Sequence, residues 1–419
     1  MSLSKQSVPS KTRCRGCGNF GVALVIDLGA MPPANKLCKT AEESRNLAQY
    51  PLVMGQCEDC GLAQLMYDCK PEELFSDYPY FSSFSSTWLL HAENFAKLAV
   101  SKLELSQSSF VVEIASNDGY LLQYFKQAGC QVLGIDPAES VLEAATIKGI
   151  ETIQKFFDES VAIKLQAERG SADLIIANNV LAHVVDPIGL LRGVAHLLAA
   201  EGVFSCEFPS LSNLIDSAAF DTIYHEHFSY LSLSAVKKMF DQAGLKVIEV
   251  QQLPTHGGSL RVWGSLISAN KEIHPAVQTV LEDETSRFIA EPRGLRTIDH
   301  DARHARDGLK KFLSDQSVAR KTVMGYGAAA KGITFLNYAN ISSIELPAIA
   351  DLNPAKQGRC APKSAIPIVS VESLVAAQPD FVLILPWNLK DEISRQLICV
   401  RDWGGKFVVA VPKLELFQA

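Results

Sequence analysis

The sequence predicts an α/β protein in which a small cysteine-rich module precedes two successive Rossmann-like sheets. Three observations predict this class of fold. Two CxxCG motifs stand in an N-terminal segment of short apolar stretches with little helical period. After this segment come two separate series of apolar runs that alternate with helical segments, which is the pattern of parallel sheets with crossover helices. From these changes we expect domains over residues 1–72, 73–247 and 248–419.

The overall composition is that of a globular protein with several domains. The 419 residues are 47% hydrophobic and 20% charged, and the formal net charge is −7. Because the chain has no basic block, we expect no nucleic-acid partner. No apolar run approaches the roughly 18 residues of a membrane span, and no apolar signal stretch opens the chain. We therefore expect a cytoplasmic protein without a membrane partner.

The two CxxCG motifs predict a structural zinc site in the first domain. Four thiolates can surround one tetrahedral Zn²⁺, and each following glycine lets backbone amides turn toward the sulfurs. Four protein ligands leave no open position for catalysis. The alternative is four free cysteines in a small irregular domain. The expected ligands are Cys14, Cys17, Cys57 and Cys60.

The second region predicts the first parallel sheet. Strand-like runs at residues 110–114, 131–135, 172–177 and 202–208 alternate with helical segments at 120–128, 138–148 and 187–198. Each helical segment is long enough to cross from one strand to a parallel neighbour.

The first strand of this sheet ends in EIASNDG (residues 113–119), which predicts a cofactor site. A dinucleotide fold needs GxGxxG, whereas this turn has one glycine, so it serves a pyrophosphate poorly. The turn instead fits the E/D-x-G-x-G/N-x-G pattern of S-adenosylmethionine (SAM) methyltransferases, with alanine at the first glycine position. An acid after the next strand can accept both ribose hydroxyls. The alternative is a structural turn with incidental acids. The residues expected at the cofactor are Glu113, Ala115, Ser116, Asn117, Gly119, Asp136, Pro137 and Asn178.

A histidine-rich segment, YHEHFSY (residues 224–230), concentrates groups that move protons near neutral pH. Two other interpretations remain open, a polar surface turn and a metal site. A metal would use His225 and His227, which share one face of an extended strand, but no third ligand stands nearby. A further histidine, His183, follows the Asn178–Asn179 pair close to the expected cofactor.

The third region contains strand-like runs at residues 245–250 and 259–263, a polar helical stretch at 275–317, and a second strand–helix series from residue 321 onward. Its GYGAAAKG motif (residues 325–332) follows a strand and opens a helix, which suits phosphate. A rival interpretation is an NAD-type site. Asp351 is expected either to contact ribose or to form a turn, and Arg261 either to bind phosphate or to form a surface salt bridge. The expected phosphate-site residues are Gly325, Gly327, Ala328 and Lys331.

The order of these motifs resembles the sugar C-methyltransferases that act on nucleotide-linked 4-keto-deoxysugars. The resemblance runs through CxxC…CxxC, YPYFSS (78–83), EIASNDG, NNVLAHV (178–184), YHEHFSYLS (224–232), THGGSLR (255–261) and GYGAAAKG, and thus covers nearly the whole chain. It implies a zinc-binding module, a SAM domain, a C-terminal domain that helps to bind the nucleotide sugar, and a monomer.

The resemblance also implies roles for individual residues. It makes His227 the base that removes a proton from the carbon beside the ketone, and it adds Tyr80 and Ser83 to the substrate-binding set. The residues that it places in the catalytic set are His227, Tyr224, Glu226, His183 and Tyr78.

These observations lead to one principal hypothesis, SAM-dependent methylation at C-3 of a 4-keto-6-deoxysugar nucleotide. Carbon methylation needs a carbon nucleophile, and a C–H beside a ketone supplies one when the enolate is stabilised. The alternatives are methylation at C-5 across the ketone, a zinc-containing NAD-dependent oxidoreductase, and an inactive sugar-nucleotide binding module.

Overall fold

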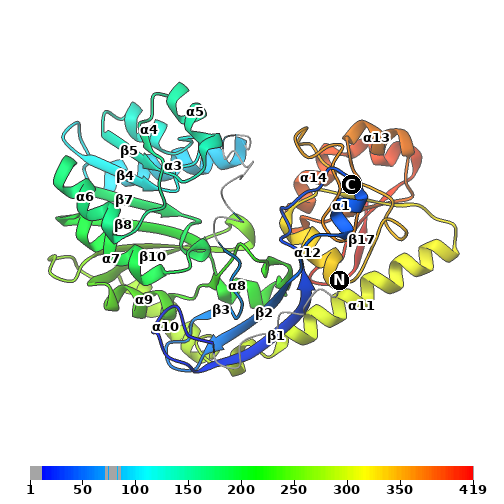
Figure 1. The fold of residues 1–419 in the computed structure, drawn as a ribbon, viewed down its shortest axis with the longest axis horizontal. Helices are drawn as coiled ribbons and strands as arrows, with labels where there is room; N and C mark the ends of the chain where they lie inside the picture. The colour runs from blue at the N-terminus through cyan, green and yellow to red at the C-terminus, as the bar shows by residue number, and fades with distance from the viewer. Residues whose placement is uncertain (1–11, 71–73, 75–82, 84–85, 419) are drawn as a thin grey trace.

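The computed structural model describes residues 12–70, 74, 83 and 86–418. In this part of the chain the strands form three sheets of four, seven and six strands. Figure 1 shows two α/β units side by side, with strands β1 and β2 of the N-terminal module lying below and between them. None of the helices in the described ranges is long and apolar enough to cross a membrane.

The N-terminal module is an antiparallel sheet in the order β1-β2-β3-β9. Its first three strands come from the cysteine-rich segment, but β9 belongs to the histidine-rich segment far along the chain. The module therefore includes part of the expected catalytic motif. Its elements are β1 (Val22–Met31), α1 (Ala41–Arg45), β2 (Tyr50–Cys57), β3 (Ala63–Leu65) and β9 (Ser229–Tyr230).

The second unit has the strand order β10-β11-β8-β7-β4-β5-β6. The strands from β8 to β6 run parallel, whereas β11 and β10 pair antiparallel at one end. The strands are β4 (Phe110–Ile114), β5 (Gln131–Ile135), β6 (Thr152–Ile153), β7 (Ala172–Asn178), β8 (Leu198–Pro209), β10 (Leu245–Leu253) and β11 (Ser259–Leu266).

The expected domain boundary between residues 247 and 248 falls inside β10. Both β10 and β11 complete the second unit instead of opening the third. The pattern of apolar residues in β10 and β11 is that of a strand in either sheet, so the sequence does not show which sheet these strands join. The long polar stretch also divides into two helices, α10 (Pro275–Ser286) and α11 (Thr297–Val318), on either side of a 3₁₀ helix at Pro292–Leu295.

Two helices of the second unit, α6 and α7, begin where an aspartate side chain bonds a free amide of the first turn. The Asp158 carboxylate accepts from the Val161 amide at the start of α6, and Asp186 accepts from Gly189 at the start of α7, where Pro187 follows. The helices are α3 (Ser86–Lys102), α4 (Leu122–Gln127), α5 (Glu139–Ile147), α6 (Glu159–Arg169), α7 (Pro187–Leu197), α8 (Leu211–Asp216) and α9 (Leu233–Gln242), with 3₁₀ helices at Leu181–His183, Phe220–Thr222 and Thr255–Gly257.

The C-terminal unit has the strand order β14-β13-β12-β15-β16-β17, parallel except for the last strand. This arrangement confirms the second Rossmann-like sheet. Its elements are β12 (Val323–Tyr326), α12 (Ala330–Tyr338), β13 (Ile349–Ala350), β14 (Ile368–Val369), α13 (Val371–Ala377), β15 (Phe381–Ile384), α14 (Lys390–Gln396), β16 (Lys406–Val409) and β17 (Glu415–Phe417), with 3₁₀ helices at Trp387–Leu389 and Ile398–Trp403.

The N-terminal module joins the cores of both α/β units. Cys57, Cys60 and Leu62 are buried in one apolar cluster with residues of the second unit. Ile26 and Leu52 of the same module are buried in another cluster, together with the C-terminal unit. Because one small sheet contributes to both cores, its loss would expose apolar surface on both sides.

Candidate active site and metal centre

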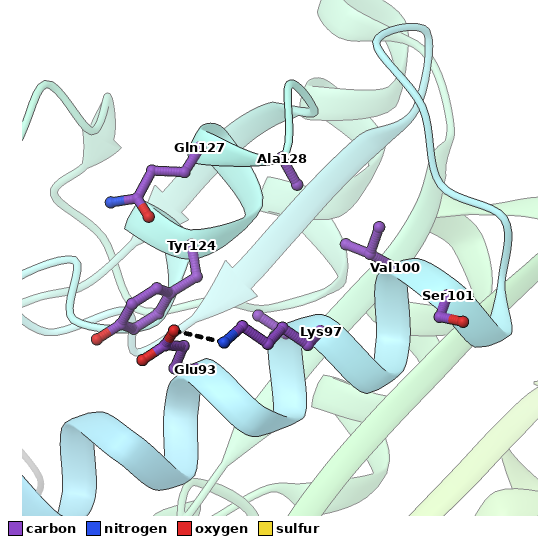
Figure 2. A pocket seen from close by; sticks show the side chains of 8 residues that line it. Glu93, Lys97, Val100, Ser101, Tyr124, Gln127 and Ala128 are labelled. Atoms are coloured by element: carbon purple, nitrogen blue, oxygen red, sulfur yellow. Dashed lines mark ion pairs between the residues drawn. The ribbon is translucent and has the colours of Figure 1, made fainter.

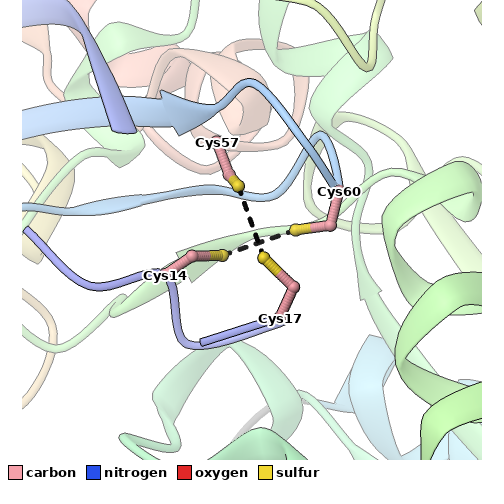
Figure 3. Close-up of side chains that lie close together, drawn as sticks. All are labelled: Cys14, Cys17, Cys57 and Cys60. Carbon is pink, nitrogen blue, oxygen red and sulfur yellow. Dashed lines mark hydrogen bonds between the residues drawn. The ribbon is translucent and has the colours of Figure 1, made fainter. Parts of the chain in front are cut away.

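The four expected cysteines lie together at one end of the N-terminal module (Figure 3). The sulfurs of Cys14 and Cys60 are 3.4 Å apart, those of Cys17 and Cys57 are 3.6 Å apart, and all four lie within 4.8 Å of one another. Sulfurs at about 2.3 Å from a tetrahedral Zn²⁺ are separated by about 3.8 Å, so the cluster fits zinc. In the described ranges no other group of three or more metal-binding side chains gathers in this way. The metal interpretation of the histidine-rich segment is therefore not supported.

The cofactor turn after β4 has a backbone that few residues adopt. Ala115, Asn117 and Gly119 have φ angles of +54°, +50° and +73°. A left-handed backbone favours glycine because a Cβ crowds the following carbonyl oxygen. This explains why glycine is typical at the first of these positions, where the chain carries alanine.

Buried polar atoms without partners gather at the carboxyl ends of β4 and β7. In the part of the chain that the structure describes, Glu113 Oε2, Ser116 Oγ and Asn178 Oδ1 make no hydrogen bond. Burial, with further repulsion from Asp136, raises the pKa of Glu113 well above its ordinary value. Unpaired buried polar groups are costly, so these atoms fit a ligand that supplies hydrogen-bond donors. The donor groups of SAM suit this set.

Asp136 stands at the end of β5 and organises the turn. One carboxylate oxygen accepts from the Asn117 amide and the other from the Ala138 amide, both at 2.9 Å. Burial raises the pKa of Asp136, and these two backbone bonds oppose that rise. Each oxygen can accept a further bond, which is the capacity that two ribose hydroxyls require. Pro137 lies between these contacts and is half-buried.

Ser83 lies at the cofactor turn. Its hydroxyl donates to Asp118 Oδ2, which also pairs with Lys148 Nζ at 3.0 Å. The structure therefore places Ser83 beside the SAM turn, and its expected contact with the sugar stays a prediction. Tyr78 and Tyr80 lie outside the described residues.

The histidine-rich segment gives His227 a defined tautomer. Its Nδ1 lies 3.0 Å from the Thr222 carbonyl oxygen, which can only accept, so Nδ1 carries the hydrogen. Its Nε2 then accepts from the Tyr224 hydroxyl at 2.9 Å. The ring is 7% exposed. A neutral imidazole with its Nε2 lone pair on a phenol is an arrangement suited to proton transfer.

His183 connects this segment to the cofactor edge. It follows the end of β7, and its ring lies 4.7 Å from that of His227. Its Nδ1 donates to the Glu226 carbonyl oxygen at 2.7 Å. Burial lowers the pKa of His183 to about 4, so the ring is neutral at physiological pH. His183 and His227 are thus brought together although 43 positions separate His183 from its bonded partner, Glu226.

Glu226 and His225 point into the protein. The Glu226 carboxyl accepts from Asn35 Nδ2 at 3.2 Å, and burial raises its pKa to about 7. The His225 ring lies 3.3 Å from the Tyr50 carbonyl oxygen, and burial lowers its pKa to about 4. Both partners belong to the N-terminal module. The interpretation of this segment as a polar surface turn is wrong, since all three residues of the H-E-H run are buried.

The GYGAAAKG motif forms a tight turn between β12 and α12. Gly327 has a φ angle of +85°, and a Cβ there would lie 2.6 Å from Pro386. Gly325 packs against Ile349. The Ala328 amide donates to Asp351 Oδ2 at 2.8 Å, so this amide is already occupied. The ribose role of Asp351 stays open, but its turn-forming role is clear.

Lys331 of the C-terminal unit lies near Asp221, three residues before the histidine-rich segment. Its Nζ lies 5.6 Å from the centroid of the Trp387 ring, and the Trp387 Nε1 donates to Asp221 Oδ2 at 2.9 Å. Burial lowers the pKa of Lys331, while the nearby Asp221 opposes this change. Sequence reasoning missed Asp221 and Trp387. The only signal was an acid within the apolar run 219–223, and the contact across units depends on tertiary structure.

Arg261 lies in a buried network on the second unit. It pairs with Glu207 at 2.7 Å, and Glu207 also bonds His91 at 2.9 Å. The guanidinium lies 4.3 Å from the Phe95 ring centroid. The expected surface salt bridge is in fact a buried one, and the pairing gives no support to a phosphate role. His91 and Glu207 were not expected.

A shallow depression lies on the outer surface between α3 and α4 (Figure 2). Tyr124 and Gln127 line it from α4, and the ion pair of Glu93 with Lys97 borders it from α3. None of the expected site residues lines it, so it is separate from the site built above.

Three family models match consecutive parts of the chain. They are a zinc binding domain over residues 14–75, a methyltransferase domain over residues 88–250 and a C-methyltransferase C-terminal domain over residues 254–412. The last two begin near α3 and just after β10.

Similar proteins include one that matches almost end to end. The chain is 34% identical over 406 residues to the C-methyltransferase NovU of Streptomyces niveus, with 97% of each chain covered. It is 25% identical over 150 residues to the ubiquinone biosynthesis O-methyltransferase of Vibrio parahaemolyticus, covering 32% of this chain and 63% of that relative. The SAM-bound magnesium protoporphyrin IX methyltransferase of Synechocystis PCC 6803 matches with a TM-score of 0.33 and 15% identity, covering 42% of this chain and 78% of that one.

The full-length similarity and the site agree with each other. The four clustered cysteines form the zinc site of the N-terminal domain, and the second unit holds SAM. The oxidoreductase and inactive-module alternatives are thereby set aside. The chain belongs to the C-methyltransferase family and is a SAM-dependent enzyme.

Proposed function

We propose that the enzyme methylates C-3, the carbon beside the ketone, of a nucleotide-linked 4-keto-6-deoxysugar. His227 is the base in this proposal. The observation that carries it is the fixed tautomer of His227, whose Nδ1 hydrogen is held by the Thr222 carbonyl while Nε2 accepts from Tyr224. An imidazole arranged in this way can receive one proton, at Nε2, without turning its ring.

The proton transfer uses Tyr224 as well as His227. The Tyr224 hydroxyl first turns from Nε2 to the ketone oxygen, which frees the Nε2 lone pair. Nε2 then takes the proton from the sugar carbon, the electron pair of the C–H bond moves into the enolate, and the Tyr224 hydroxyl stabilises the charge that develops on the enolate oxygen. The imidazolium that forms is stabilised by the Thr222 carbonyl and later loses its proton to water.

SAM supplies an electrophilic methyl group to the nucleophilic carbon and leaves as S-adenosylhomocysteine. The residues at the carboxyl ends of β4, β5 and β7 hold it, with Glu113 and Asn178 offering unpaired acceptors. His183 stands between this edge and His227. Holding the methyl group and the carbon nucleophile in line supplies much of the rate.

The C-terminal unit supports the nucleotide part of the substrate in this proposal. Lys331 lies near Asp221, six residues before His227 in the chain, and its ammonium suits a diphosphate. A nucleotide held by this unit would place its sugar toward Tyr224 and His227.

The proposal is tested by incubating the enzyme with SAM and a 4-keto-6-deoxysugar nucleotide, with thymidine and guanosine diphosphate forms in parallel. NMR then locates the new methyl group. The same substrates in D₂O without SAM report exchange at the carbon. We expect His227→Asn to reduce both methylation and exchange by about 10²–10⁴-fold.

His225→Asn is the matched control, because His225 lies two residues away and contacts Tyr50 of the N-terminal module. We expect it to retain exchange at a temperature where circular dichroism shows it folded. A methyl group at C-5 would correct the position. Normal turnover of His227→Asn would remove His227 from its role.

A further inference from the structure

We propose that Arg15 is a positioning residue for the segment that carries His227, so that the zinc module orients the base. The inference rests on the proposed role of His227. Arg15 stands between the zinc ligands Cys14 and Cys17 and reaches to Phe228, the residue that follows His227. Nothing in the motif pattern of the sequence links these two positions.

The contacts of Arg15 hold its side chain in one place. Its Nη1 donates to the carbonyl oxygens of Leu65 and Phe228, each at 3.0 Å, and its Nη2 pairs with Asp68. Its backbone amide donates to Gln64 Oε1 at 2.8 Å. The Arg15 side chain is 6% exposed, so its bonds to the two carbonyl oxygens are largely shielded from water, whereas Asp68 is 44% exposed. The planar guanidinium of Arg15 has several N–H donors and can bridge these acceptors, whereas the ammonium of a lysine cannot reproduce the whole set of bonds.

The segment beyond His227 is a strand of the zinc module. In β9, Ser229 pairs with Gln64 and Tyr230 pairs with Ala63. The Phe228 carbonyl also accepts from the Leu65 amide at 3.0 Å, so it receives two bonds from the module. The backbone on the C-terminal side of His227 is thus fixed by residues from the first part of the chain.

The other side of His227 is fixed within the segment itself. Its amide donates to the Tyr224 carbonyl at 2.9 Å, which closes a turn. Between this turn and the Phe228 carbonyl, the Cα of His227 has little freedom, and its Nε2 faces Tyr224. A misplacement of about 1 Å can cost about 10²-fold in rate, so the position of this backbone matters.

The metal site fixes the backbone position of Arg15, from which its side chain extends to Phe228. Gly16, the next residue, donates its amide to the Cys14 sulfur at 3.3 Å, and both flanking cysteines belong to the zinc site. A bound ion therefore fixes the knuckle on which Arg15 stands. This gives the metal module a role in catalysis through the position of the base.

The test compares Arg15→Ala and Arg15→Lys with Arg13→Ala in the full-length zinc-loaded enzyme. Arg13 is the matched control, since it stands in the same knuckle but is exposed and donates to the Gly18 carbonyl at 3.0 Å. The measurements are zinc per chain, SAM affinity, amide hydrogen exchange of the peptide spanning residues 224–230, and kcat and KM with the thymidine and guanosine diphosphate forms of the 4-keto-6-deoxysugar.

For Arg15→Ala we expect kcat to fall by about 10–100-fold while KM and SAM affinity stay within about twofold. Hydrogen exchange in residues 224–230 should rise with zinc content unchanged. Arg15→Lys should recover part of kcat, because a lysine can reach one of the two carbonyls. Arg13→Ala should match the unmodified enzyme.

Two outcomes would overturn the proposal. If Arg15→Ala shows the same kcat and the same exchange as Arg13→Ala, the contact does not position the segment. If Arg15→Ala loses its zinc, Arg15 serves the metal site instead. Should His227→Asn retain turnover, the base assignment fails separately, and the hydrogen exchange of residues 224–230 still decides whether Arg15 holds the segment.

Discussion

The two α/β units of this chain use the same backbone device with different side chains. In each, the residue after the first strand has a positive φ angle, Ala115 at +54° and Gly327 at +85°. In each, an aspartate at the end of the next strand binds that turn. Asp136 accepts from the amides of residues 117 and 138, and Asp351 accepts from those of residues 328 and 353.

The difference lies in what surrounds this device. The first unit leaves acceptor atoms of Glu113 and Asn178 without partners, which suits a ligand with donor groups. In the second unit Lys356 bonds both the Ala328 carbonyl and Asp351, and Lys331 stands at the start of the helix. The positive-φ turn and the aspartate that binds it therefore recur with the fold, whereas the side chains at the strand ends select the ligand.

The largest effect on stability is expected from Gly327→Ala. The added Cβ would lie 2.6 Å from Pro386 and would also force alanine into a left-handed backbone. We expect the free energy of unfolding to fall by about 2–4 kcal/mol, measured by urea denaturation.

Gly358→Ala is the control for this change. Gly358 has a φ angle of +78° but no atom within 4 Å of an added Cβ. It should lose only the backbone contribution of about 1 kcal/mol. Equal losses in both variants would show that the close approach to Pro386 contributes nothing.

The next effect concerns ligand affinity and separates the two aspartates. Asp136→Asn should weaken SAM binding by about 10-fold or more, because a side-chain amide has one acceptor oxygen where the carboxylate has two. Asp351→Asn should leave SAM affinity unchanged. Isothermal titration calorimetry with SAM checks both, with melting curves to confirm folding.

A loss of SAM affinity in Asp351→Asn would show that the two sites are not independent. Unchanged affinity in Asp136→Asn would place the ribose elsewhere in the second unit.

The smallest effect is expected from Ala115→Gly. Relief of the left-handed strain is worth about 1–2 kcal/mol, and the greater freedom of glycine in the unfolded chain offsets about 0.4–1 kcal/mol of it. We expect a net gain of up to about 1.5 kcal/mol in the free energy of unfolding.

The same chemical change in a helix gives the opposite sign and serves as the reference. Ala144→Gly in α5 should lose about 1 kcal/mol. A loss of stability in Ala115→Gly of similar size would mean that the alanine is not strained.

Much of the fold could be predicted from local patterns. The strands at residues 110–114 and 131–135 occur as expected, because a buried strand in a parallel sheet is a continuous apolar run. The boundary expected at residues 247/248 falls inside β10, whose pattern does not show which sheet it joins. The site could be predicted as a set of motifs, but not the contacts of Asp221 with Trp387 or of Arg15 with Phe228.

The sequence by itself determined the four ligands of the zinc site and predicted the cofactor turn and the proposed proton-transfer residues, because each depends on residue types at short spacing. Tertiary structure alone decided that β9 joins the zinc module and that Arg15 binds the carbonyl next to His227. Those contacts join positions 213 residues apart. Every residue carries a backbone carbonyl that can accept a hydrogen bond, so only the folded chain shows which carbonyl a distant arginine reaches.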